Sequence, residues 1–173
     1  MLITIIMIQV FIGGVKMSAR SAISPKEIQL NVVATDWVAA IQKAAQPLVD
    51  ENHITGDYVQ AMIDSVKKLG PYIVIAPGLA LGHARPSAAV KQTAFSIATL
   101  KDPVKFGNEQ NDPVDLVVIL ASINSSDHLE LMRKVVNFLN KADNLKFLRQ
   151  ATTEADKATV AGQINGGVAE WKF

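Results

Sequence analysis

Two of the three histidines in the chain lie where they could do chemistry. His83 lies in a segment, residues 76–86, that has Gly and Pro at both ends, which fixes a turn and lets a ligand come close. His128 lies in the first turn of an expected helix, where free N–H groups and the macrodipole favour an anion. A neutral imidazole is a competent nucleophile near pH 7. These residues alone leave open the ordinary alternative that both are surface or core histidines.

Other kinds of site find little support in the composition. His53 matches no motif and is expected to be a loop residue. No group of residues with metal-ligand spacing accompanies the histidines, so we predict no metal and no cofactor. The absence of cysteine excludes disulfides, thiolate zinc sites and cysteine nucleophiles, and it suits a reducing compartment. With a net charge of +1 there is no basic excess, so nucleic acid is not an expected partner.

Length and patterning predict a single compact domain, because 173 residues match about one domain and no linker or repeat interrupts the chain. The uncharged apolar stretch 1–15 is broken by Gln9 and by two glycines, and it is too short to span a membrane. It also lacks the leading charge of a signal peptide. We therefore expect residues 1–17 to be an N-terminal extension, with Met17 the true start, and residues 18–173 to be the domain.

The elements that must position the histidines follow from periodicity. Residues 28–32 alternate as a strand does, and a helix with Thr35 as its cap follows, with an apolar face formed by Trp37, Ala40, Ile41, Ala44 and Leu48. A second helix opens at residues 55–57, carries Val59, Met62, Ile63 and Val66 on one face, and ends at Gly70. The two helices are expected to join near His53.

The second half of the chain alternates strands and helices. Residues 72–76 are expected to form a buried strand between layers, followed by a turn at 77–78, and residues 93–100 and 114–121 to form two more strands separated by an exposed loop. A helix after Ser126 or Asp127, capped by one of them, should bury Leu129, Met132, Val136 and Leu139. Two short helices, 144–150 and 153–164, complete the chain. The fold class is α/β, with a central mixed β-sheet covered by helices on both faces.

Two runs carry a resemblance to a known family. These are GPYIVIAPGLALGHARPSAAVKQTAFSIATLKDPVKFG and NDPVDLVVILASINSSDHLELMRKVVNFL. In content, order and spacing they resemble the enzyme IIA (type 2) domain of the sugar phosphotransferase system (PTS) in its mannitol–fructose–ascorbate class, and they are most similar to the ascorbate-type members. The resemblance covers roughly residues 28–164.

The resemblance implies a phosphotransferase with a phosphohistidine intermediate. His83 stands at the position of the histidine that accepts a phosphoryl group from the histidine-phosphocarrier protein and passes it to a IIB component. His128 stands at the position of the second histidine, which supports the phosphorylated state. A cytoplasmic location, indirect association with a membrane IIC transporter and uptake of ascorbate or a similar carbohydrate follow from the same resemblance. The alternative, from another class of function, is a regulatory module of the nitrogen type, switched by phosphorylation.

Two positions depart from the family pattern. Gly82 stands where members usually carry a proline directly before the first histidine. Residues 65–68 lack the arginine that mannitol-type members carry on the preceding helix. Arg85 is the candidate for the missing positive charge, beside the alternative that it is a solvated loop residue.

Overall fold

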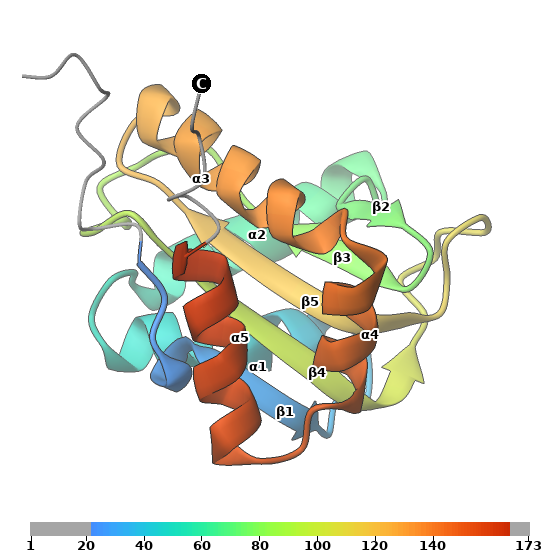
Figure 1. Ribbon diagram of the computed structural model, residues 1–173. Coiled ribbons are helices and arrows are strands. Elements are labelled where there is room, and N and C mark those ends of the chain that lie inside the picture. The colour runs from blue at the N-terminus through green and yellow to red at the C-terminus, as the bar shows by residue number, and fades with distance from the viewer. Residues whose placement is uncertain (1–21, 167–173) are drawn as a thin grey trace, which may run out of the picture.

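The computed structural model describes residues 22–166, which form one mixed five-stranded sheet with helices on both faces (Figure 1). The expected N-terminal extension, residues 1–17, lies outside the described residues. The strands are β1 (Ile28–Val32), β2 (Val74–Ala76), β3 (Leu79–Gly82), β4 (Ala94–Val104) and β5 (Val114–Ala121). Their order is β1-β4-β5-β3-β2. The β1–β4 and β3–β5 pairs are parallel and the other two are antiparallel, so the predicted mixed sheet is confirmed.

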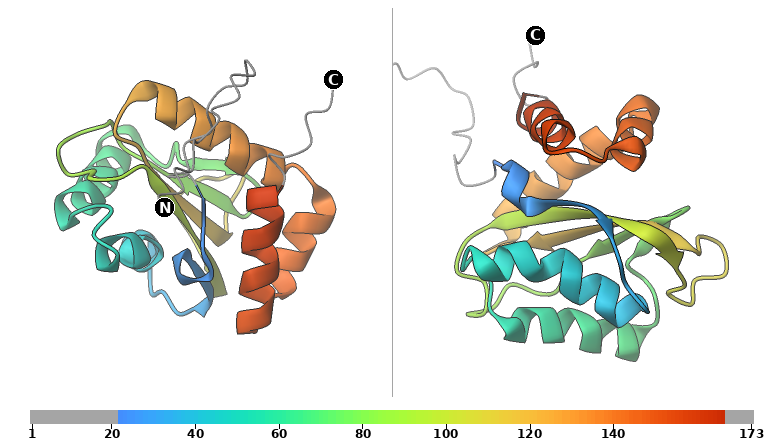
Figure 2. Two further views of the ribbon diagram at one scale, coloured as in Figure 1. Left: turned by 60° about the vertical axis from the view of Figure 1, so that its left-hand side comes forward. Right: turned by 90° about the horizontal axis from the view of Figure 1, so that it is seen from below.

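The helices divide into two layers, which Figure 2 shows on opposite sides of the sheet. One layer holds α1 (Trp37–Asp50) and α2 (Gly56–Leu69), and the other holds α3 (Ser125–Leu139), α4 (Ala142–Gln150) and α5 (Glu154–Gly166). A 3-10 turn, η2 (Pro25–Glu27), precedes β1. Of the helices between residues 22 and 166, none has the length and apolar character that a membrane span requires.

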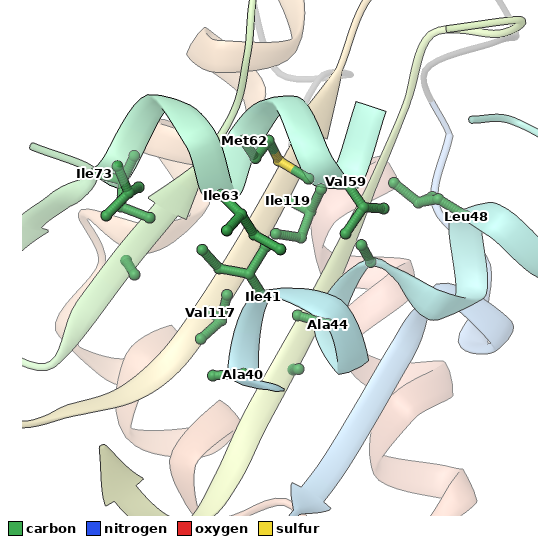
Figure 3. Packing of buried hydrophobic residues seen from close by; sticks show 14 of the residues in the cluster. Ala40, Ile41, Ala44, Leu48, Val59, Met62, Ile63, Ile73, Val117 and Ile119 are labelled. Atoms are coloured by element: carbon green, nitrogen blue, oxygen red, sulfur yellow. The ribbon is translucent and has the colours of Figure 1, made fainter. Parts of the chain in front are cut away.

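Alternate residues of β5 bind the two layers together, because successive side chains of a strand point to opposite faces. Val117 and Ile119 pack with α1 and α2, in the cluster that Figure 3 shows, whereas Val118 packs with the α3 to α5 layer. The predicted apolar faces of α1 and α2 are confirmed, since Ile41 and Met62 are among the fully buried side chains.

The expectations for two helix starts are wrong. The side chain of Asp36, not Thr35, caps α1 by accepting a hydrogen bond from the Ala39 N–H at 2.8 Å. At α3 the cap is Asn124, which accepts from the Asp127 N–H at 2.8 Å, so neither Ser126 nor Asp127 has this role. In each case several neighbouring residues have capping side chains, and the backbone entry into the helix selects one.

The expected face of α3 is also wrong in part. Leu129 is 59% exposed, while Leu131 and Val135 are buried against the sheet. Met132 lies at the edge of this contact. The helix carries apolar residues on two adjoining stripes, and its packing against β5 decides which stripe faces inward.

The region around residues 72–82 differs most from expectation. Residues 72–76 are not a strand buried between layers: β2 covers only Val74–Ala76, lies at the edge of the sheet, and leaves Ile75 48% exposed. The neighbouring strand β3 is instead buried along all four residues and lies inside the sheet, between β2 and β5. The sequence did not predict it, because turn-forming residues stand on both sides of it. The expected loop 101–113 begins as the last residues of β4, and Val104 and Phe106 are buried in it.

Candidate phosphoryl-transfer site

The fold places His83 and His128 side by side, although 45 residues separate them in sequence. His83 directly follows β3, and His128 lies in the first turn of α3, which follows β5. Because β3 and β5 are parallel neighbours, their carboxyl ends meet at one edge of the sheet, where ligands of α/β proteins commonly bind. The ring centroids lie 5.8 Å apart with an angle of 47° between the planes.

The backbone fixes the tautomer of His83. Its Nδ1 lies 2.8 Å from the carbonyl oxygen of Leu81, an acceptor, so this nitrogen carries the proton and donates it. The other ring nitrogen, Nε2, then has its lone pair available for attack. The ring of Tyr72 packs edge-on against the His83 imidazole, with 5.7 Å between the ring centroids, and its hydroxyl donates to the His83 carbonyl at 3.3 Å.

His128 is held by the start of α3. Partial burial, and secondly the charge of nearby His83, hold the pKa of His128 below its usual 6.5. Its imidazole is therefore neutral at pH 7 and can offer one N–H to an anion. The preceding residue, Asp127, accepts a 2.7 Å hydrogen bond from the buried hydroxyl of Thr93, which ties this first turn to β4.

Both imidazoles line an open pocket of about 340 Å³. Its lining residues come from α2, the segment before β2, the turn after β3 and the start of α3; they are Ser65, Leu69, Tyr72, His83, Ala84, Arg85, Pro86, Ser125 and His128. Of the described residues that line the pocket, Arg85 is the only one with a positively charged side chain of the Lys or Arg type. The pocket thus combines an available nucleophilic nitrogen, a second imidazole and a cation, which suits a phosphoryl group.

The third histidine lies apart from this pocket. His53 is in the connection between α1 and α2, as predicted, and its carbonyl accepts from the backbone N–H groups of Lys91 and Gln92. Residues 22–166 contain no group of three or more His, Asp or Glu side chains that could hold a metal ion.

Sequence reasoning missed Tyr72, Ser65 and Ser125 as members of the pocket. The predicted buried strand 72–76 would bury Tyr72, but this residue is 40% exposed beside His83. Its place in the GPY run, next to a helix-ending Gly-Pro pair, was the available signal. Ser65 lies on α2, in the stretch where mannitol-type members carry arginine.

Comparison with known proteins decides the family. Residues 21–158 match the model of the family described as "Phosphoenolpyruvate-dependent sugar phosphotransferase system, EIIA 2". The chain belongs to this family. It is thus an EIIA component of the sugar phosphotransferase system, a carrier in phosphotransfer. The predicted resemblance to the enzyme IIA family is confirmed.

Two individual EIIA proteins show which members of the family the chain is similar to. This EIIA chain is 37% identical over 141 residues to the ascorbate-specific PTS EIIA component of Escherichia coli K12, covering 81% of the chain and 92% of the relative. The solution structure of the mannitol-specific cryptic enzyme IIA of E. coli is 31% identical, with a TM-score of 0.72, over 80% of this chain and 93% of that one.

A second solved structure is similar in fold alone. It is the E. coli mannitol enzyme IIA in complex with phosphorylated enzyme IIB, 24% identical with a TM-score of 0.69, over 81% of this chain and 96% of the other. The five-stranded mixed sheet and its two helical layers are therefore the architecture of EIIA relatives.

Proposed function

We propose that this EIIA protein accepts a phosphoryl group on Nε2 of His83 from the histidine-phosphocarrier protein and passes it to a IIB component. The contact that carries the proposal is the 2.8 Å separation between Nδ1 of His83 and the Leu81 oxygen. It holds the ring in the tautomer whose remaining nitrogen is nucleophilic. That nitrogen belongs to a ring lining the pocket shared with His128.

The transfer step balances without a cofactor. The Nε2 lone pair forms a bond to phosphorus as the P–N bond of the donor phosphohistidine breaks, and the electron pair of that bond stays with the donor imidazole. His83 keeps its Nδ1 proton, which is donated to Leu81 throughout. The phosphorylated ring is then cationic and next to the negative phosphoryl oxygens, so the group remains transferable. In the next step a cysteine thiolate of IIB forms a bond to the same phosphorus as the P–Nε2 bond breaks, and the electron pair of that bond returns to Nε2 of His83.

His128 and Arg85 would stabilise the charge of the transferring group. The neutral imidazole of His128 is close enough to donate an N–H to a phosphoryl oxygen on its neighbour. Arg85 is an exposed side chain of the pocket lining and supplies a guanidinium, which matches phosphoryl oxygens in geometry as well as charge. This assigns to the loop the guanidinium that residues 65–68 of α2 lack.

The relatives support the proposed substrate and partners. The 37% identity to an ascorbate-specific component supports a role in uptake of ascorbate or a similar carbohydrate. The structure of a related fold bound to phosphorylated IIB supports a IIB partner, met through a transient interface of modest size. We place the protein in the cytoplasm, where a IIB component linked to a membrane IIC transporter would meet it.

Mapping the phosphoryl group tests the proposal. The protein is incubated with phosphoenolpyruvate, enzyme I and the phosphocarrier protein, and acid-labile phosphate is located by mass spectrometry. We expect label on His83 in the wild type and none in His83→Ala, with the fold retained. His53→Gln is the matched control, since His53 lies outside the pocket, and it should be labelled like the wild type. Label that persists in folded His83→Ala contradicts the assignment.

Addition of a IIB protein separates the carrier from a regulatory switch. A carrier must empty His83 rapidly into IIB, whereas a switch of the nitrogen type need not. His128→Ala should accept the phosphoryl group and then transfer it more slowly, because the phosphoryl oxygens lose one N–H donor. Unchanged transfer in His128→Ala would remove the role proposed for it.

A further inference from the structure

A buried tyrosine hydroxyl lies directly beneath the segment that carries His83. Tyr58 is in the first turn of α2 and is 1% exposed. Its hydroxyl donates to the carbonyl oxygen of Leu120 on β5 at 2.8 Å and accepts from the N–H of Ala84 at 3.1 Å. A third contact, of 3.2 Å, reaches the Ala84 carbonyl. The hydroxyl thus joins α2, the end of β5 and the residue that follows His83.

The strand register shows what this hydroxyl replaces. In the parallel ladder Leu79 pairs with Leu116 and Gly82 with Ile119, and the Leu116 N–H donates to the Gly78 carbonyl. Continued by the same alternation, the next bond after Gly82 would run from the Ala84 N–H to the Leu120 carbonyl. These are the two groups that the Tyr58 hydroxyl separates and satisfies.

Because the Tyr58 oxygen lies between the Ala84 N–H and the Leu120 carbonyl, these two backbone groups do not bond to each other, and the pairing of β3 with β5 ends before them. The β3–β5 pairing stops at Gly82, and the chain from His83 onward leaves the sheet and lines the pocket. The ring of Tyr58 is packed in the core cluster shared with α1, so the hydroxyl has a fixed position. Burial raises the pKa of this phenol, which therefore stays protonated and keeps both of its hydrogen-bonding roles.

We propose that Tyr58 is a positioning residue for phosphoryl transfer: its hydroxyl holds the His83–Ala84 segment away from β5 so that the imidazole faces His128. The inference rests on the proposed function of His83. Tyr58 itself lies below the pocket and is not among the residues that line it. It acts through the backbone, which also supplies the Leu81 carbonyl that orients the ring.

Tyr58→Phe is the direct test, because it removes one oxygen and leaves the packed ring. The Ala84 N–H and the Leu120 carbonyl then lose their shared partner, and the His83 segment is free to shift. We expect kcat for phosphoryl acceptance to fall about tenfold to a hundredfold, as small displacements of reacting groups do, with KM for the phosphocarrier protein unchanged. The exposed surface that meets the donor is not altered by this change.

Ser96→Ala is the matched control for lost stability. The Ser96 hydroxyl is also fully buried and donates to a backbone carbonyl, that of Ala44 at 2.6 Å, which lies on α1 and not in the His83 segment. Both variants lose a buried hydroxyl, so both should unfold at lower denaturant concentration, and only Tyr58→Phe should lose kcat. Rates are compared under conditions where both variants are folded.

The ¹⁵N spectrum of the histidine rings gives a second readout that needs no phosphotransfer. In the wild type, Nδ1 of His83 should carry the proton, and in Tyr58→Phe the signals should shift toward a mixture of tautomers. The inference is overturned if kcat of Tyr58→Phe stays within about twofold of Ser96→Ala, or if the His83 ring signals are unchanged. If the wild type is not labelled at all, the proposed function fails, while the ring signals still decide whether Tyr58 holds His83.

Discussion

Thr93 ties the helix that carries His128 to the sheet, and its hydroxyl can be removed without changing the shape of the side chain. The residue is 4% exposed; its Oγ1 donates to the Asp127 carboxylate at 2.7 Å and accepts from the Ile123 N–H at 3.2 Å. Thr93→Val therefore removes both bonds at once and leaves a methyl group in place of the hydroxyl.

The expected cost follows from these two contacts. A hydrogen bond to a charged group contributes about 1.5–3 kcal/mol and a neutral one about 1 kcal/mol. Asp127 is half-buried, so water replaces part of what its carboxylate loses. We expect the free energy of unfolding to fall by about 2 kcal/mol. The first turn of α3 is loosened by the same change, so onward transfer from His83 to IIB should slow as well.

Denaturant unfolding and the IIB transfer assay check both effects, and Thr99→Val is the matched control. Thr99 is equally buried and lies on β4, the strand that Thr93 directly precedes, and its Oγ1 accepts one neutral bond, from the Asn31 N–H at 3.0 Å. The control should lose about 1 kcal/mol and transfer at the wild-type rate. A loss in Thr93→Val below about 0.5 kcal/mol, or equal transfer rates in the two variants, would refute the reasoning.

Three further predictions concern the same end of the sheet. A phosphoryl dianion on His83 should raise the pKa of His128, because attraction replaces the repulsion between two imidazoles; NMR titration before and after phosphorylation measures this, and a pKa that falls or stays constant contradicts it. In the free protein the lowered pKa of His128 means that the folded chain binds fewer protons than the unfolded one. Stability should therefore decrease as the pH falls through 6.5 toward that pKa, and His128→Gln should flatten this slope. A Cβ at Gly82 would lie 2.7 Å from Cδ1 of buried Ile119. Gly82→Ala should therefore lower the free energy of unfolding, measured with denaturant, by about 1 kcal/mol, the low end for overpacking because a terminal methyl group can move. An unchanged unfolding midpoint would show that Ile119 repacks freely.

Much of the fold could be predicted because local periodicity and the actual packing agree. Spacing predicts the apolar faces of α1 and α2, the long apolar run of residues 114–121 predicts the buried strand β5, and the structure confirms all three. Strand β3 was not predicted, because its run of four residues is half the length of β5 and turn-forming residues flank it. The face of α3 was misplaced since two apolar stripes adjoin on that helix, and only contact with the sheet selects between them.

The sequence by itself determined which two histidines are the candidate site residues, because His83 and His128 stand in motifs whose order and spacing resemble those of a known family. Their separation, the tautomer of His83 and the lowered pKa of His128 were decided by the tertiary structure, which brings the ends of two parallel strands to one edge. Tyr58 shows the difference most clearly. Its hydroxyl bonds to groups 26 and 62 residues away, so no local pattern could distinguish it from an ordinary core tyrosine.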